Sequence, residues 1–143
     1  MKLLLCTISR NNAKRLKSWY NQLNGLLDVL MVDHDVEISV YENDSTDGTK
    51  KLLERYSGLL SKRCKTTFTS TDIGTEHLVG KEGARVKNIA NARNACIEQA
   101  SSIEQFDRIV FIETDVLYKP KDAAAIIIHE ADIVSGYTTN AMG

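Results

Sequence analysis

Hydrophobic positions along the chain switch repeatedly between two spacings, and the switching predicts strands and helices in turn. Leu3 to Ile8 is a short, continuous apolar run, typical of a strand buried on both faces. Residues 12–30 then carry apolar side chains at helical spacing, separated by polar and basic residues, and predict an amphipathic helix. The apolar positions of that helix are Leu16, Tyr20, Leu23 and Leu27.

The same two spacings continue to the end of the sequence. They predict a strand at 36–41, a helix at 52–60, a strand at 65–70, a helix at 86–100, a strand at 108–112, a helix at 123–131 and a strand at 133–137. The only proline, Pro120, is expected to open the fourth helix. Strands that alternate with helices predict a three-layer α/β/α, Rossmann-like fold with a mostly parallel sheet, and Leu3 to Ile8 is expected to be a central strand.

Residues 71–84 interrupt this alternation. They contain Gly74, Gly80 and Gly83, and no hydrophobic period runs through them. Connections of this length inside a compact domain are uncommon and are usually functional or disordered. We expect the segment to be a loop that is mobile when no ligand is bound.

Composition narrows the class of protein. The 143 residues are 43% hydrophobic and 26% charged, which predicts one globular domain over 1–143. The net charge of -1 argues against a nucleic-acid partner. Cys6, Cys64 and Cys96 lack metal-ligand spacing and suit a reducing compartment, and the apolar run at the amino terminus is too short for a signal peptide or a membrane span. The chain is therefore expected to be cytoplasmic.

Acidic residues gather where the predicted strands end. The clusters that follow the strands are Thr7 to Arg10, Glu42 to Asp47, Ser70 to Asp72 and Glu113 to Asp115. Open parallel sheets bind ligands at the carboxyl ends of their strands, so these clusters are expected to meet at one edge. Carboxylates that converge there suit a hard cation such as Mg2+ or Mn2+ with substrate phosphates.

Other motifs test this interpretation. No G-x-G-x-x-G follows the first strand and no G-x-x-x-x-G-K-[ST] occurs, so neither a dinucleotide fold nor a P-loop is supported. A literal D-x-D at Asp33 to Asp35 precedes the second strand, which predicts a solvated turn at the opposite edge.

Two arginines are candidate ligands for an anion. Arg93 occupies the apolar stripe of its predicted helix, where a buried guanidinium needs an anionic partner; snorkelling or an internal ion pair would also explain it. Arg85 could meet a phosphate or be solvated.

Three motifs in this order resemble the GT-A fold nucleotide-sugar glycosyltransferases of family 2. They are Glu42 to Thr49 (ENDSTDGT), Ala92-Arg93-Asn94, and Glu113-Thr114-Asp115 in the position of the D-x-D motif. The stretches YENDSTDGT and FDRIVFIETDV are similar to those of CAP59-like mannosyltransferases of capsule synthesis, and this likeness covers nearly the whole chain.

The resemblance implies a hexosyltransferase of the EC 2.4 class that uses Mn2+ or Mg2+ and a UDP- or GDP-linked donor, with a glycan or glycoprotein acceptor. It implies that Thr7, Ser9 and Glu42 line the nucleoside pocket, that Arg93 faces the nucleotide, that Asp115 binds the metal and that Glu113 contacts the ribose or the water shell of the metal. The full set expected to bind the nucleotide sugar is Thr7, Ser9, Arg10, Glu42, Asn43, Asp44, Arg85, Arg93, Glu113 and Thr114, with Asp115 and Glu113 as metal ligands.

Several alternatives stay open at this point. The enzymes it resembles usually continue beyond the donor-binding half, so the chain is expected to be either the donor-binding core of a longer enzyme or an unusually small enzyme, and the catalytic base is unassigned. A non-catalytic nucleotide-sugar-binding module is the second hypothesis, because a fold does not fix a function. A flavodoxin-like or nucleotidyltransferase domain is the third.

Overall fold

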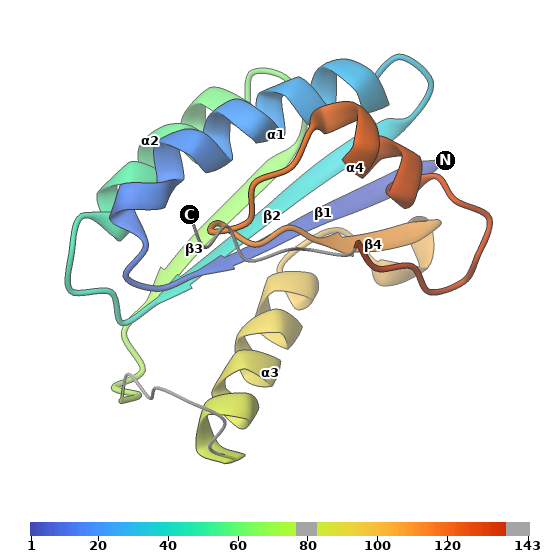
Figure 1. The fold of residues 1–143 in the computed structure, drawn as a ribbon. Helices are drawn as coiled ribbons and strands as arrows, with labels where there is room; N and C mark the ends of the chain where they lie inside the picture. The colour runs from blue at the N-terminus through green and yellow to red at the C-terminus, as the bar shows by residue number, and fades with distance from the viewer. Residues whose placement is uncertain (77–82, 137–143) are drawn as a thin grey trace, which may run out of the picture.

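The fold is an α/β arrangement around one parallel sheet (Figure 1). A computed structural model describes residues 1–76 and 83–136. In chain order the elements are β1 (Lys2–Ser9), a 3-10 turn (Ala13–Arg15), α1 (Leu16–Leu30), β2 (Asp35–Asn43), α2 (Thr49–Leu60), β3 (Thr66–Thr71), α3 (Gly83–Glu98), a second 3-10 turn (Ile103–Gln105), β4 (Arg108–Phe111) and α4 (Pro120–Ile127).

The four described strands run parallel in the order β3-β2-β1-β4. Leu5 of β1 lies opposite Ile38 of β2 on one side and opposite Val110 of β4 on the other. The continuous apolar run therefore does form an interior strand, as predicted, because a strand with neighbours on both edges and helices over both faces has no polar side.

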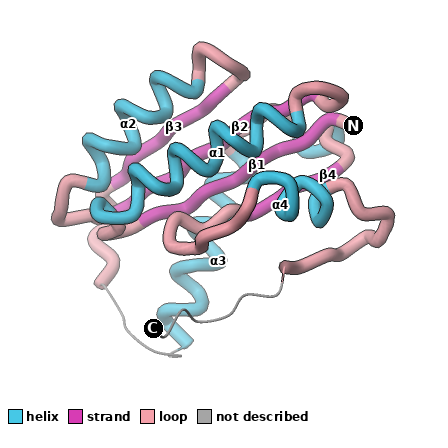
Figure 2. Tube along the Cα trace, turned by 45° about the horizontal axis from the view of Figure 1, so that its top comes forward, coloured by secondary structure: helices cyan, strands magenta, loops and turns pink. Residues whose placement is uncertain are grey.

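The two faces of the sheet are covered unequally. Figures 1 and 2 show α1, α2 and α4 on one face and α3 alone on the other. Leu3 and Leu5 point into the larger core with α1 and α2, whereas Leu4 and Cys6 point toward α3 and belong to one cluster with Cys96. This alternation follows from the period of two along a strand. It means that an odd or even position in β1 decides which layer a side chain enters.

The helix α3 leans away from the sheet, with its carboxyl-terminal end nearest the strands in both ribbon views. Cys96, near that end, is its one buried residue, while the first turns carry exposed side chains. The first turns of α3 and the carboxyl ends of the strands contribute residues to one cavity.

Most predicted elements form, with bounds shifted by a few residues. The prediction of a strand at 133–137 is wrong for the described residues 133–136, which adopt no regular structure, and Tyr137 lies outside the described residues. A β-branched sequence forms a strand only where it can pair and be buried, and Ile133 is 93% exposed. The helix predicted at 123–131 is α4, which begins at Pro120 as expected and ends at Ile127.

The expected loop at 71–84 is shorter than predicted. Thr71 ends β3, residues 72–76 have no regular structure, and Gly83 and Ala84 already belong to α3. Residues 77–82, which include Gly80, lie outside the described residues. The mobility of the segment therefore stays a prediction. No helix in the described ranges 1–76 and 83–136 is long and apolar enough to cross a membrane.

Candidate functional site

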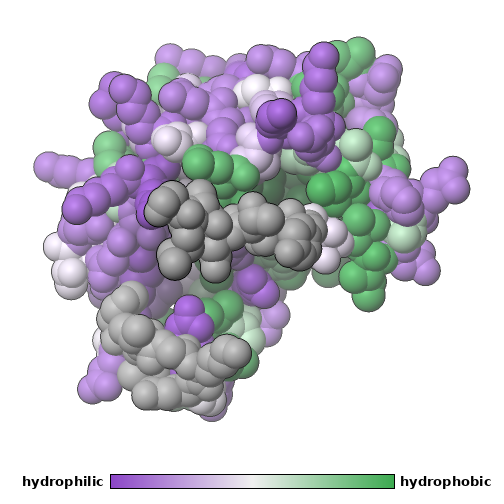
Figure 3. All heavy atoms as spheres, viewed as in Figure 1, coloured by the Kyte–Doolittle hydropathy of each residue, from purple (hydrophilic) through white to green (hydrophobic). Residues whose placement is uncertain are grey.

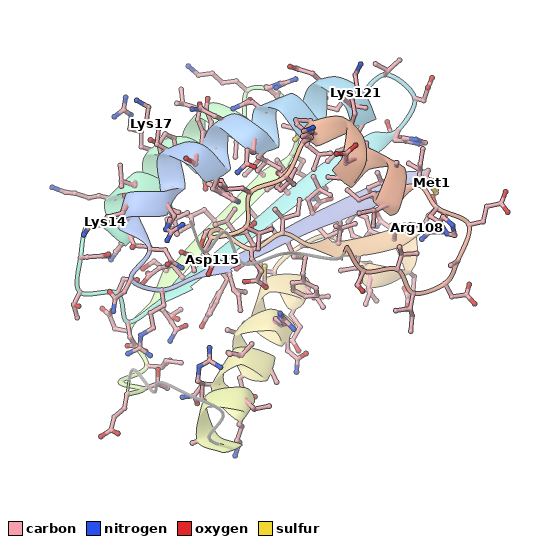
Figure 4. The ribbon with its side chains drawn as sticks, viewed as in Figure 1. Met1, Lys14, Lys17, Arg108, Asp115 and Lys121 are labelled. Carbon is pink, nitrogen blue, oxygen red and sulfur yellow. The ribbon has the colours of Figure 1, made fainter. Side chains whose placement is uncertain are left out.

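A cavity of about 570 Å³ opens at the carboxyl ends of β1, β2 and β4, beside the first turns of α3. The predicted site residues that it brings together are Ser9, Arg10, Asn43, Arg85, Arg93, Glu113 and Asp115. Figure 4 labels Asp115 after β4, away from Met1 and Arg108 at the amino ends of the strands. The cavity therefore lies at the edge where parallel sheets bind ligands.

Two asparagines that follow β1, Asn11 and Asn12, connect the end of this strand to the loop after β2. Asn11 has a φ of 53°, a left-handed conformation that asparagine tolerates, and its Oδ1 accepts a hydrogen bond from the backbone N–H of Thr46 at 2.8 Å. The backbone N–H of Asn12 donates to Thr49 Oγ1 at 2.9 Å. These bonds join the chain after β1 to the loop after β2, so the two strand ends form one rim.

Glu42 does not line the cavity, contrary to the expectation of a nucleoside contact. It is 1% exposed, and its two oxygens accept hydrogen bonds from the backbone N–H of Ser45 at 2.7 Å and from Ser70 Oγ at 2.5 Å. Side chains alternate along β2, so Glu42 shares the face of Val40, which α1 and α2 cover, whereas Asn43 faces α3. The buried charge is stabilised by these donors.

Thr7 also points away from the cavity, which corrects the expectation from sequence. Its hydroxyl donates to the carbonyl of Ile112 at 2.9 Å and accepts from Trp19 Nε1 at 3.2 Å. Thr7 follows Leu3 and Leu5 on the α1 face of β1, so it holds the sheet to α1. Thr114, another expected contact, is buried, and its Oγ1 accepts a hydrogen bond from Asn12 Nδ2 at 2.9 Å.

Two further acids of the loop after β2, Asp44 and Asp47, accept hydrogen bonds from neighbouring loops. Asp47 accepts from the backbone N–H of Thr49 at 2.9 Å and from that of Ala13 at 3.2 Å. Asp44, which was expected to contact the nucleotide, lies beside the cavity and does not line it; the amide of Asn43, followed by donors of Gly74 and Thr75, holds the pKa of its carboxyl well below the usual range. Burial acts to raise the pKa of Asp47, but the hydrogen bonds from Thr49 and Ala13 together outweigh it, so this pKa is also lowered.

Arg93 is more exposed than its place in the apolar stripe predicts, because α3 leans away from the sheet. Its side chain is 45% exposed, its Nη2 lies 3.0 Å from Glu113 Oε1, and its guanidinium lies over the ring of Phe111. The internal ion pair that the sequence left open is therefore present. Both charged residues line the cavity.

Asp115 is exposed, and its carboxylate has no hydrogen bond or ion pair to another residue in the described ranges. No group of three or more His, Cys, Asp or Glu side chains that could hold a metal ion occurs within residues 1–76 and 83–136. A cation at Asp115 would therefore need oxygen ligands from a substrate or from water as well. The literal D-x-D at Asp33 to Asp35 lies at the other edge of the sheet, as predicted. Asp33 and Asp35 are exposed, and Asp35 is the register partner of Lys2 at the start of β1 and β2.

The sequence missed part of the lining, namely Ile8, Asn12, Glu76, Asn88, Ile89 and Ala92. A signal for three of them was present. Asn88, Ile89 and Ala92 lie between Arg85 and Arg93 at spacings of three and four, so they share one face of α3. Counting back along the helix from Arg93 would have found them.

A second cavity of about 640 Å³ lies between β4, the segment that follows it and α4, and its lining is mainly apolar. Glu113 borders both cavities. Tyr118 also lines the second cavity, and burial raises the pKa of its hydroxyl to about 12. Figure 3 shows hydrophobic side chains gathered on the side of the molecule where Figure 1 places α4. Ile128, the residue that follows α4, is exposed.

Comparisons with known proteins identify the family. Residues 2–141 match the family described as Cryptococcal mannosyltransferase 1. Among solved structures, the crystal structure of S. aureus TarS 1-349 in complex with UDP matches with a TM-score of 0.54 and 23% sequence identity, over 89% of this chain and 32% of that chain. At that identity the match shows the fold, and this chain spans about a third of the length of the TarS chain. No curated protein sequence matches. With nearly its whole length covered by the family profile, the chain belongs to the cryptococcal mannosyltransferase 1 family, the CAP59-like glycosyltransferases.

Proposed function

We propose that the cavity binds a nucleoside-diphosphate sugar and that the chain acts as a metal-dependent glycosyltransferase toward a glycan or glycoprotein acceptor. The observation that carries this proposal is the meeting of three arginines, Arg10, Arg85 and Arg93, with Asp115 in one cavity at the carboxyl edge of the sheet. The family gives the reaction class, and the TarS structure of similar fold is described as a complex with UDP.

The polarity of the lining suits a diphosphate. Guanidinium groups bind phosphate oxygens through charge-assisted hydrogen bonds, and three of them border one space here. Ser9 adds a hydroxyl that is buried and has no hydrogen-bond partner in the described part of the chain. Asn43 Oδ1 is an acceptor for the nucleoside, since the amide of this residue already donates to Asp44.

The donor set also fits a divalent cation. Mg2+ is commonly held by one or two carboxylates together with substrate phosphates, and Asp115 and Glu113 are two carboxylates on this cavity. Asp115 would hold the ion, and Glu113 would contact it, its water shell or the ribose. When bound, the ion supplies Lewis-acid stabilisation of the leaving diphosphate.

The residues of the chain have their own part in the reaction. When the bond between sugar and phosphate breaks, negative charge grows on the nucleoside diphosphate. Arginines placed beforehand stabilise that charge, and they do so more strongly in a cavity than in open water. Arg93 is suited to this task because it can leave Glu113 as the charge on the diphosphate increases. The base that deprotonates the acceptor is not assigned.

A screen of UDP-, GDP- and dTDP-sugars tests the proposal. Thermal stabilisation by one of them in the presence of Mn2+, reversed by EDTA, is expected because ligand binding raises the apparent stability. Hydrolysis or transfer of the sugar, measured on the same samples, tests the enzyme activity. A protein that no activated sugar stabilises contradicts the proposed function.

A non-catalytic nucleotide-sugar-binding module is the second candidate. Such a module would use the same cavity and its three arginines but needs no catalytic base, and a fold does not fix a function. Calorimetric binding of a UDP- or GDP-sugar without any Mn2+-dependent turnover would support the module. Turnover that disappears with EDTA would reject it.

A further inference from the structure

Among the described residues, Asp44 accepts more hydrogen bonds than any acid that lines the cavity, although Asp44 itself does not line it. Its carboxylate accepts from the backbone N–H of Gly74 at 2.9 Å, from Thr75 Oγ1 at 2.8 Å and from the backbone N–H of Thr75 at 3.3 Å. It also accepts from the side-chain amide of Asn43 at 2.9 Å. One side chain at the end of β2 therefore holds the segment that follows β3.

Thr75 connects Asp44 to the cavity. The carbonyl of Thr75 accepts from Arg10 Nη2 at 2.7 Å, and its hydroxyl accepts from Arg10 Nη1 at 3.1 Å. Nη1 also donates to the carbonyl of Glu76 at 3.3 Å. Arg10 lines the cavity. The position of its guanidinium there therefore depends on the segment around Thr75, which Asp44 holds in place.

The backbone at Asp44 is consistent with a dedicated role. Its φ of 55° is left-handed, a conformation that is unfavourable for most residues and that, apart from glycine, aspartate and asparagine tolerate best. Glycine would fit the backbone but would leave the N–H groups of Gly74 and Thr75 without their acceptor. The position therefore combines a conformation available to few residues with a carboxylate that stays ionised.

We propose that Asp44 is a positioning residue, which acts through Thr75 to hold the Arg10 guanidinium in the orientation that receives the diphosphate. The inference rests on the proposed function of the cavity. It differs from a purely structural role in one respect: the loss of Asp44 must act on the ligand through Arg10. If Asp44 only stabilises the fold, its loss would weaken binding by the same factor whether or not Arg10 is present.

A double-mutant cycle separates the two roles. The variants are Asp44→Ala, Arg10→Ala and the double variant, with UDP and GDP as calorimetric probes in the presence of Mn2+. Asp44→Asn is included because asparagine keeps the left-handed backbone and one acceptor oxygen if Asp44→Ala folds poorly. Asp47→Ala is the matched control, since it also removes a carboxylate that accepts backbone N–H groups in the same loop.

We expect Asp44→Ala to weaken binding of the probe about tenfold, which is roughly 1.4 kcal/mol. Asp44→Asn is expected to lose less. In the Arg10→Ala background, Asp44→Ala should change the affinity less than about twofold, because residues that act through one contact are not additive. Fully additive losses, or no loss in Asp44→Ala, overturn the proposal.

A second readout needs no ligand and so keeps this proposal separate from the proposed function. In Asp44→Ala, the backbone amides of Gly74 and Thr75 should exchange with solvent faster, and the side-chain nitrogen signal of Arg10 should shift. In Asp47→Ala, both should stay as in the native chain. If the native chain binds neither UDP nor GDP, the proposed function fails, and an unchanged Arg10 signal in Asp44→Ala would overturn the positioning role independently.

Discussion

Arg93 and Glu113 form an ion pair between α3 and the segment after β4, with 3.0 Å between Nη2 and Oε1. The two side chains are 45% and 39% exposed, so solvent screens the pair and its contribution to stability is small. The guanidinium also lies 5.1 Å from the centre of the Phe111 ring, which keeps it at the cavity wall. A diphosphate brings more negative charge than one carboxylate and can therefore compete for Arg93.

Glu113→Gln tests this competition. The amide keeps the shape of the side chain and removes its charge, so Arg93 becomes more available to a phosphate. An exposed ion pair is worth about 0–1 kcal/mol, so we expect the affinity for UDP or GDP in EDTA to rise up to about fivefold. Calorimetry in EDTA checks this. Weaker binding in EDTA would mean that Glu113 itself contacts the nucleotide.

Asp115→Ala should abolish the part of nucleotide binding that depends on Mn2+. Asp115 lines the cavity, and its carboxylate has no hydrogen bond or ion pair to another described residue. Because the side chain is exposed, the fold should survive, with a change in the free energy of unfolding within about 0.5 kcal/mol. Calorimetry with and without Mn2+ measures the effect. Asp33→Ala, at the opposite edge of the sheet, is the control and should leave the metal dependence unchanged. Retained dependence in Asp115→Ala contradicts the assignment.

The sequence predicted the layers and the edge of the site well, because both depend on order along the chain. The run from Leu3 to Cys6 in β1 is apolar because this strand is interior and covered on both faces, whereas β4 is half-buried at the edge of the described sheet. The ends of the two strands carry Ser9, Arg10 and Asp115 to one cavity. The order of strands and helices, together with the rule for parallel sheets, was sufficient for this.

The side on which each strand-end residue lies could not be predicted in the same way. Thr7 and Glu42 both fall on the α1 face of the sheet, and the cavity lies on the α3 face. The sequence shows the alternation along a strand but not which helix covers which face. The lean of α3, which exposes Arg93, likewise results from packing and has no local signal. Residues 133–137 have strand propensity in their sequence, but the described residues 133–136 have no neighbouring strand to pair with.

The stability of the protein should fall as the pH drops below about 4. The pKa values of Asp44 and Asp47 lie below the ordinary value of 3.8 in the folded state, so the folded state binds fewer protons than the unfolded chain. Their contribution is therefore complete above that value and is lost as the pH falls toward the folded pKa values. Urea denaturation at pH 7, 5, 4 and 3 measures it.

Asp44→Asn provides the control for this dependence. An amide at position 44 does not titrate, so the decline in the free energy of unfolding between pH 4 and pH 3 should be smaller in the variant than in the native chain. Parallel declines in the two proteins would show that Asp44 does not contribute to the acid sensitivity.

Gly25→Ala and Gly58→Ala should change stability in opposite directions, although both glycines lie within helices. Alanine is favoured over glycine in a helix by about 0.5–1 kcal/mol. At Gly58 in α2 a Cβ would meet nothing within 4 Å, so that gain should appear in full. At Gly25 in α1 a Cβ would lie 2.8 Å from Pro120 Cγ, at the first turn of α4, and the rigid proline ring cannot turn aside.

Overpacking of this kind typically costs about 1–3 kcal/mol, which exceeds the helical gain. We therefore expect urea denaturation to show a stabilised Gly58→Ala and a Gly25→Ala destabilised by roughly 1 kcal/mol or more, because α4 must move away from α1 to admit the methyl group. Since α4 borders the apolar cavity, that movement should leave nucleotide binding at the other cavity unchanged. A Gly25→Ala protein as stable as Gly58→Ala would mean that α4 is not held against α1 at this contact.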